Sequence, residues 1–259
     1  MLISIITVVK NDLVRLKETV SSLKYVYNDN SFEHIIVDGN SKDNTKSFIK
    51  NIQRNCNNVI YNSSHDHGIY DAMNKGFKLS KGDFIIFLNA GDRLIANKKN
   101  LTLTLKKFIE TEINIICFPY MHEFLDQSIL RCPKRINKDK LPTSHQAMFF
   151  SKLFLNNNEY NLDYKFGSDF DLYLRSDPKN IIIISEFEPI SVVELNGITS
   201  KNLTFSYGEY KKIISKNFFG IFKVYLLVKI SIKVTMVMFL KKIFSRNITF
   251  IIRKLLAKL

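Results

Sequence analysis

The chain has 259 residues, of which 46% are hydrophobic and 24% charged. These proportions are those of an average packed protein and exclude collagen-like, mucin-like and wholly disordered chains. A formal charge of +14 is typical of nucleic-acid-binding proteins. Residues 205–259, however, hold twelve Lys and Arg and one acid, Glu209, which accounts for +11 and leaves +3 for residues 1–204. We therefore predict a basic tail and no nucleic-acid partner.

The three cysteines, Cys56, Cys117 and Cys132, form no C-x-x-C pair. An odd number at wide spacing does not suit a disulfide framework, so we expect a reducing cytoplasmic compartment. The first apolar run begins at Leu2 and ends by Lys10, without a preceding basic region or a following cleavage pattern. It is typical of a buried strand rather than of a signal peptide.

Short apolar runs and helix-like stretches alternate over the first hundred residues. Residues 12–26 have helical spacing of apolar side chains, with Asp12 as a possible N-cap. Alternation of this kind predicts βαβ units on a parallel sheet with helices on its faces, an α/β fold. The predicted strands are 2–9, 33–37, 58–62 and 83–88.

The pattern is weaker after residue 100. We expect a helix near 98–110, an apolar run at 113–118 and a polar, basic stretch at 131–146. Helical spacing returns at 168–175, and strand-like runs follow at 181–184 and 190–195.

Each predicted strand ends in polar residues, at the edge of the sheet where α/β proteins bind ligands. The first runs into Asn11 and the second into Asp38 and Gly39. Asp38 is suited to accept hydrogen bonds from a base or a ribose, and Gly39 lets the backbone approach a ligand closely. The alternative for Asp38 and Ser41 is that they only cap the next helix.

The segment 66–76 (DHGIYDAMNKG) places Asp71, Asn74 and Lys75 on one helical face. Such a face suits a phosphate and a sugar, and the alternative is an ordinary solvated face. The triplet His65-Asp66-His67 lacks a further spaced ligand, so a metal site is not expected there.

Asn89 and Asp92 follow the fourth strand in FLNAGD, residues 87–92. Mg²⁺ prefers few carboxylates together with waters and substrate phosphates. Asp92 is therefore the candidate metal ligand, although a Gly-Asp turn after a strand is common.

The motifs TVVKND, IIVDGNSKDNT, DHGIYDAMNKG and FLNAGD, in this order, resemble family 2 glycosyltransferases, above all bacterial polysaccharide and lipopolysaccharide transferases. The resemblance spans residues 2–95 most strongly. It implies a GT-A fold over residues 1–204, a nucleotide-diphosphate sugar donor, Mg²⁺ or Mn²⁺, and inversion at the anomeric carbon.

By the same resemblance, Asp38 holds the nucleoside, Asp66 helps to position it, and Asp92 is the last acid of a D-x-D-like motif. Where that motif has its two earlier acids, this chain has Asn89 and Gly91.

Inverting transfer needs a general base for the acceptor hydroxyl. The candidate is Asp169 in KFGSDFDLYLR, residues 165–175, which resembles the family's E-D motif, with Asp171 in reserve. The alternative is an acidic first helical turn stabilised by the helix dipole.

His145-Gln146 resembles an H-Q pair near the acceptor side, and the alternative for His145 is a structural histidine. Residues 196–200 (NGITS) resemble a late loop that closes over the diphosphate.

Residues 205–259 contain no uninterrupted apolar stretch long enough to span a bilayer. Seven lysines fall within an arc of roughly 140° on one helix, and they are Lys211, Lys212, Lys216, Lys223, Lys229, Lys233 and Lys241. A second short piece, residues 248–258, repeats the pattern with Arg253, Lys254 and Lys258. This basic amphipathic pattern predicts binding to an anionic membrane, with packing on the catalytic domain or in a dimer as alternatives.

The sequence therefore predicts a glycosyltransferase that acts on a glycan or lipid-linked acceptor at the inner face of the cell membrane. Two alternatives stay open. One is a nucleotidyltransferase, which needs a Gly-rich phosphate loop after the first strand, and the other is a non-enzymatic membrane or nucleic-acid adaptor.

Overall fold

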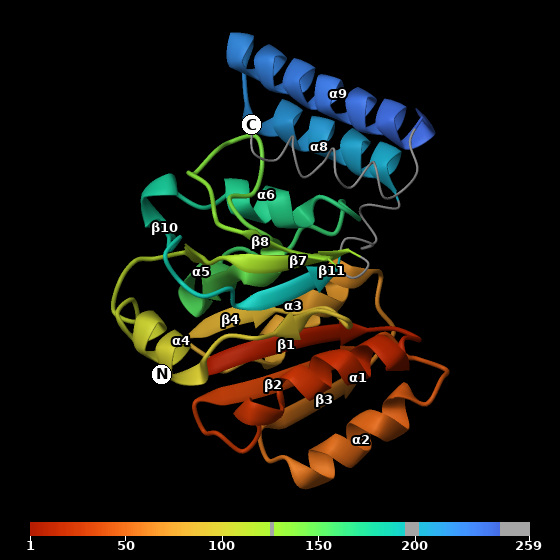
Figure 1. The fold of residues 1–259 in the computed structure, drawn as a ribbon, viewed down its shortest axis with the longest axis vertical. Coiled ribbons are helices and arrows are strands. Elements are labelled where there is room, and N and C mark those ends of the chain that lie inside the picture. Colours follow the sequence, from red (N-terminus) through yellow and green to blue (C-terminus); the bar gives the residue numbers. More distant parts are fainter. Residues whose placement is uncertain (125–126, 195–201, 244–259) are drawn as a thin grey trace. The chain divides into compact units, whose positions relative to one another are not determined.

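A computed structural model of the chain describes residues 1–124, 127–194 and 202–243. It contains two compact units, Met1–Leu195 and Asn196–Leu259. Figure 1 shows the strands and helices of both units.

A seven-stranded sheet forms the centre of the first unit, in the order β10-β6-β9-β4-β1-β2-β3. The pairs β1–β2, β1–β4, β2–β3 and β6–β10 are parallel, whereas β9 is antiparallel to both β4 and β6. The sheet is thus mostly parallel, as predicted. Its strands are β1 (Ile3–Val9), β2 (Phe32–Asp38), β3 (Val59–Ser63), β4 (Phe84–Phe87), β6 (Ile115–Cys117), β9 (Met148–Ser151) and β10 (Ile181–Ile183).

Parallel register brings the polar strand ends together. Val9 pairs with Asp38, and Asp38 pairs in turn with Ser63. The backbone N–H of Ala90 donates to the carbonyl of Val8 at 3.2 Å. The residues that follow β1, β2, β3 and β4 therefore lie along one edge of the sheet.

Helices cover both faces of this sheet. Leu16 of α1 and Ile49 of α2 belong to one buried cluster with Val9 and Ile36, and Figure 1 shows both helices on the same side of β1–β3. On the other face α3 approaches closely, because a Cβ at Gly76 would lie 2.5 Å from Ile6. The helices are α1 (Leu13–Ser22), α2 (Thr45–Asn55), α3 (Ile69–Leu79), α4 (Lys98–Lys106), α5 (Lys152–Asn156) and α6 (Ser168–Leu174), with short 3₁₀ helices η1 (Lys24–Val26), η2 (His145–Ala147) and η3 (Pro178–Asn180).

A second sheet of four strands, in the order β5-β11-β7-β8, was not predicted. Its hairpin β7–β8 is hard to recognise because β8 is largely exposed and carries no continuous apolar run. The strands are β5 (Arg93–Leu94), β7 (Tyr120–Phe124), β8 (Gln127–Arg131) and β11 (Ser191–Glu194).

The second unit contains two packed helices, α8 (Leu203–Asn217) and α9 (Gly220–Ile243). Phe218 has an extended backbone, and Gly220 has a φ of +60°, a left-handed conformation that glycine adopts without strain. The single lysine arc predicted across residues 211–241 is therefore wrong, because this break separates the lysines of α8 from those of α9.

In the described part of the chain, no helix is long and apolar enough to cross a bilayer. Residues 248–258, predicted as a second basic amphipathic piece, lie outside the described residues.

Candidate active site at the strand ends

Asn11, Asp38 and Ser41 join the ends of β1 and β2. The backbone N–H of Asn11 donates to Ser41 Oγ at 2.7 Å, and the N–H of Lys42 donates to Asn11 Oδ1 at 2.7 Å. Asn11 has a φ of +51°, a conformation that asparagine tolerates better than most residues. These contacts fix the loop that follows β2 beside the end of β1.

Asp38 is fully buried, and its carboxylate accepts three hydrogen bonds. The donors are the backbone N–H of Ser41 at 3.0 Å, Tyr61 Oη at 3.1 Å and Ser63 Oγ at 3.1 Å. Asp38 and Ser41 do not cap the next helix, which was the alternative considered, because α2 begins at Thr45 with Asn44 as its N-cap. The contact between Asp38 and Ser41 lies within the loop. It shapes the loop beside which the predicted nucleoside contact would form.

Gly39 makes room for the carboxylate of Asp66. A Cβ at position 39 would lie 2.2 Å from Asp66 Oδ2, so any larger residue would displace this side chain. Asp66 Oδ1 lies 3.8 Å from Lys10 Nζ and accepts a hydrogen bond from the N–H of Gly68 at 3.2 Å. The structure therefore brings Asn11, Asp38, Gly39 and Asp66 together.

The polar face of α3 holds neighbouring loops in place. Asp71 accepts a hydrogen bond from the N–H of His67 at 2.9 Å and forms an ion pair with Lys75 at 3.0 Å. Lys75 Nζ donates to the carbonyl of His65 at 2.6 Å. The amide of Asn74 exchanges two hydrogen bonds of 2.9 Å with the backbone of Tyr160. These three side chains thus bond to other parts of the protein. The face is therefore neither an ordinary solvated surface nor reserved for a ligand.

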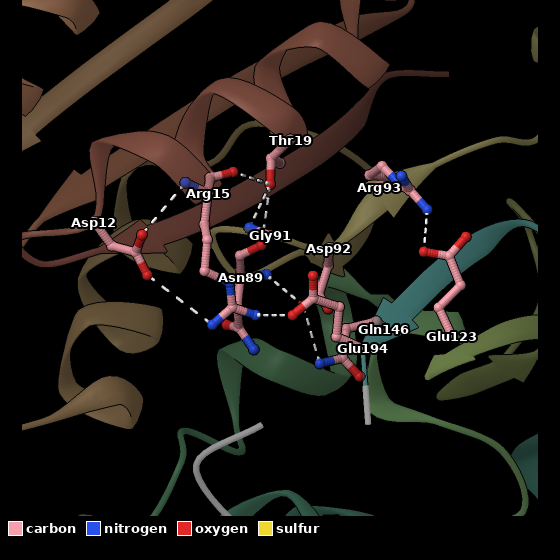
Figure 2. A network of polar contacts seen from close by, with 10 residues as sticks. All are labelled: Asp12, Arg15, Thr19, Asn89, Gly91, Asp92, Arg93, Glu123, Gln146 and Glu194. Atoms are coloured by element: carbon pink, nitrogen blue, oxygen red, sulfur yellow. Dashed lines mark hydrogen bonds and ion pairs between the residues drawn. The ribbon is translucent and has the colours of Figure 1, made fainter. Parts of the chain in front are cut away.

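The turn Asn89–Asp92 follows β4 and is held by hydrogen bonds within itself, to Thr19 of α1 and to Gln146 of η2 (Figure 2). Asp92 Oδ2 accepts hydrogen bonds from the N–H of Asn89 at 3.0 Å and from Gln146 Nε2 at 3.1 Å. Asp92 is only 4% exposed, and this burial raises its pKa to about 7, against the opposing effects of Gln146, Asn89 and Arg15. In the folded chain Asp92 is therefore about half protonated at pH 7.

Arg15, in the first turn of α1, packs on Gly91 beside this carboxylate. Gly91 has a φ of +101°, and a Cβ there would lie 2.4 Å from Arg15 Nε. Arg15 Nη2 forms an ion pair with Glu194 at 3.1 Å, and Nη1 lies 4.0 Å from Asp12 (Figure 2). Sequence reasoning missed Arg15 and Glu194, because 179 residues separate them.

The oxygen atoms of this turn fit a hard divalent cation. Asn89 Oδ1 is buried without a hydrogen-bond partner within the described part of the chain. Asp12, Asp92 and Glu194 surround one cation, Arg15, which leaves an excess of negative charge. No group of three His, Cys, Asp or Glu suited to a metal occurs among the described residues. Phosphate oxygens and water must then supply most ligands, as Mg²⁺ sites commonly require.

A chain of side-chain contacts leads from Asp92 toward Asp169. Gln146 binds Asp92, and its neighbour His145 Nε2 lies 2.6 Å from Tyr160 Oη. The ring of Tyr160 stacks on Tyr70 with centroids 5.3 Å apart, and Tyr70 Oη donates to Asp169 Oδ1 at 3.2 Å. Residues from η2, α3, α6 and the loop before α6 thereby meet.

His145 has a supporting position in this chain. Its imidazole is buried and stacks on Phe87 with centroids 5.4 Å apart. Burial lowers its pKa to about 4, so the ring is neutral at pH 7. The structural alternative considered for His145 thus fits its surroundings. Gln146, the next residue in η2, contacts Asp92.

Asp169 and Asp171 have different surroundings. Asp169 is partly exposed and accepts hydrogen bonds from Tyr70 and from the N–H of Phe170. Asp171 is 4% exposed and forms an ion pair with Arg175 at 3.2 Å. A general base must reach a substrate hydroxyl, so Asp169 is the better placed of the two. The predicted loop 196–200 lies outside the described residues.

Comparison with known proteins identifies the family of the chain. The model of glycosyl transferase family 2 matches residues 4–170. The chain belongs to glycosyl transferase family 2. A relative from Campylobacter jejuni, named GalNAc(5)-diNAcBac-PP-undecaprenol beta-1,3-glucosyltransferase, is 26% identical over 235 residues, which are 82% of this chain and 74% of the relative.

Solved structures of low identity share the fold. Staphylococcus aureus TarS in complex with UDP-GlcNAc has a TM-score of 0.65 at 16% identity, covering 89% of this chain and 71% of the TarS chain. Mannosyltransferase PcManGT from Pyrobaculum calidifontis, in complex with GDP-Man and Mn²⁺, has a TM-score of 0.61 at 12% identity, covering 98% and 79%. The predicted GT-A fold is thus confirmed.

The predicted enzyme class is also confirmed, since this chain is a glycosyltransferase. A nucleotidyltransferase and a non-enzymatic adaptor, the two alternatives, are excluded by the family match over residues 4–170.

Proposed function

We propose that this glycosyltransferase transfers a sugar from a nucleotide-diphosphate donor to a hydroxyl group of a glycan or lipid-linked acceptor, with inversion at the anomeric carbon. The observation that carries the proposal is the chain of contacts from Asp92 through His145-Gln146 to Asp169. It connects a carboxylate suited to a cation with a carboxylate suited to a general base.

The nucleoside end of the donor lies, in this proposal, beside Asn11, Asp38, Gly39 and Asp66. Acids and amides at the ends of adjacent parallel strands suit the hydroxyl and N–H groups of a nucleoside. TarS with UDP-GlcNAc and PcManGT with GDP-Man have a similar fold, which supports a donor of this class.

The diphosphate end lies beside Asn89 and Asp92, where these two side chains would hold Mg²⁺ or Mn²⁺. The cation acts as a Lewis acid on the departing diphosphate when bound. Asp92 must be ionised for this role, and Arg15 favours the ionised form. The ion pair between Arg15 and Glu194 keeps the guanidinium beside Gly91.

Asp169 removes the proton from the acceptor hydroxyl as its oxygen bonds to the anomeric carbon and the bond to the diphosphate breaks. One displacement of this kind inverts the configuration. Tyr70 donates to Asp169 and so limits the orientations of the carboxylate. Asp171 forms an ion pair with Arg175 instead.

The acceptor belongs to surface polysaccharide or lipopolysaccharide biosynthesis, and the enzyme works on the cytoplasmic face of the cell membrane. Two observations support this part of the proposal. The Campylobacter relative is named for an undecaprenol-linked substrate, and residues 205–259 combine twelve basic residues with abundant apolar ones.

A donor-hydrolysis screen tests the proposal. UDP-, GDP- and dTDP-sugars are each incubated with the full chain and with Mg²⁺, Mn²⁺ or EDTA. We expect slow, cation-dependent release of one nucleoside diphosphate, lost in Asp169→Asn with nucleotide binding retained. If the chain bound no nucleotide in the presence of either Mg²⁺ or Mn²⁺, the proposal would be contradicted.

A further inference from the structure

Helix α9 has an apolar face that is exposed to solvent. Ile221 is 90% exposed and Ile232 63%, values far above those of a packed side chain. Nine large apolar side chains described in this helix are exposed, and they are Ile221, Phe222, Val224, Tyr225, Val228, Ile232, Met236, Met238 and Phe239.

All of these except Phe222 and Met238 lie on one side of the helix. At about 100° per residue these seven fall within an arc of about 120°, with Phe222 and Met238 about 40° beyond its two edges. Leu226, on the opposite side, is buried, and Tyr207 of α8 hydrogen-bonds to Ser231. These contacts lie outside the apolar arc, with Ser231 about 20° beyond its edge at Val224, and the arc itself stays exposed.

The charge around this arc is entirely positive. Lys229 and Lys233 are exposed along one border, and no acid follows Glu209 in the chain. The aromatic ring of Tyr225 lies within the arc, with Lys229 Nζ 5.7 Å from its centroid. Lysines beside an apolar stripe with an aromatic residue suit the boundary between lipid headgroups and acyl chains.

We propose that α9 lies in the plane of an anionic membrane, with its apolar arc inserted between the lipids and Lys229 and Lys233 at the headgroups. A second copy of the chain fits less well, because it would bring together two tails of +11 each. Anionic lipid supplies the opposite charge. The apolar arc of α9 would thus be the surface that contacts the membrane. Only its biological purpose rests on the membrane location in the proposed function.

Flotation of the full chain with phosphatidylcholine vesicles, with and without phosphatidylglycerol, tests the inference. We expect binding that requires phosphatidylglycerol and weakens with salt. Ile232→Asp should reduce binding about tenfold or more, because it places a charge among the acyl chains. Lys229→Gln with Lys233→Gln should weaken binding to the anionic vesicles.

Leu103→Asp is the matched control. Leu103 is 52% exposed on α4 of the catalytic unit, so this variant introduces the same charge at another exposed apolar position. Its vesicle binding should equal that of the native chain, and circular dichroism should show equal helix content in both variants.

Donor hydrolysis measured without vesicles separates this inference from the proposed function, since Ile232→Asp should leave it unchanged. Vesicle binding that survives Ile232→Asp, or no binding at all, would overturn the inference. So would a native dimer that Ile232→Asp converts to a monomer, since the apolar arc would then be an interface between copies.

Discussion

The two ends of the proposed active site are built in different ways. The proposed donor end, around Asn11, Asp38 and Asp66, is held by short hydrogen bonds in loops that follow adjacent parallel strands. The proposed acceptor end, around Tyr160 and Asp169, is held by stacked aromatic rings and single hydroxyl contacts between distant segments.

This difference suggests a division of function. Backbone register fixes the donor end, so single side-chain changes there should alter donor affinity. The acceptor end depends on the position of one carboxylate, so changes there should alter the rate of transfer. Each of the following variants tests this separation.

Asp169→Asn should have the largest effect on transfer. Loss of a general base commonly costs a factor of 10² to 10⁴, so we expect kcat to fall about a thousandfold. Calorimetric affinity for the donor nucleotide should stay within about twofold of the native value, because the contacts of the donor end are intact.

Asp171→Asn is the control for that prediction. It breaks a buried ion pair with Arg175 and should lower the melting temperature clearly, since breaking such a pair is strongly destabilising. The folded fraction should retain most of its kcat. Equal loss of kcat in both variants would show that Asp169 has no special role.

Asp92→Asn should reduce transfer about a hundredfold, the usual cost of losing one charge-stabilising group. The same variant should raise the free energy of unfolding near neutral pH. Burial raises the pKa of Asp92 from 3.8 to about 7, so the folded state retains a proton that the unfolded state releases. Native stability must then fall as pH rises from about 4 to about 7.

Urea unfolding across this pH range measures the effect. The native chain should lose roughly 2–4 kcal/mol that Asp92→Asn does not lose. Saturating Mn²⁺ should restore most of that loss in the native chain and none in the variant. A native profile unchanged by Mn²⁺ would contradict the assignment of Asp92 as a cation ligand.

Gly39→Ala should weaken donor binding about tenfold, because a Cβ there would displace the carboxylate of Asp66. The expected change is in Kd, with kcat at saturating donor nearly unchanged. Gly208→Ala is the matched control, since a Cβ at Gly208 meets nothing within 4 Å. Equal donor affinity in both variants would remove Gly39 and Asp66 from the donor end.

Tyr70→Phe and Tyr61→Phe should have the smallest effects and form a pair. Each removes one hydroxyl group that donates to a carboxylate, Asp169 in the first case and Asp38 in the second. At about 1 kcal/mol for each hydrogen bond we expect roughly fivefold changes. Tyr70→Phe should lower kcat and Tyr61→Phe should raise the KM for donor. The reverse assignment would contradict the division between the two ends.

The same contrast explains which parts were predictable. Residues 2–95 encode their strands as apolar runs and their loops as polar clusters, so β1–β4, α3 and the adjacent positions of Asn11, Asp38 and Asp92 follow from local pattern and parallel register. The N-cap at Asp12 is confirmed by its hydrogen bond from the N–H of Arg15 at 3.3 Å.

The contacts of the acceptor end could not be predicted from any local sequence pattern. Tyr70 stands inside the quoted motif DHGIYDAMNKG, yet nothing nearby in the sequence indicates its contact with Asp169, 99 residues away. The ion pair of Arg15 with Glu194 likewise depends on where β11 lies. This strand was predicted at 190–195, but its place in a second sheet was not. The lysine arc failed because one glycine and an extended Phe218 divide a helix that periodicity alone would continue.

Crystals grown with Mn²⁺ and the nucleoside diphosphate identified by the donor screen would test the central claim most directly. The anomalous signal of Mn²⁺ should lie within coordination distance of Asp92 and of the diphosphate, with the nucleoside beside Gly39 and Asp66. A nucleotide bound away from these residues, or Mn²⁺ bound without Asp92, would contradict the account.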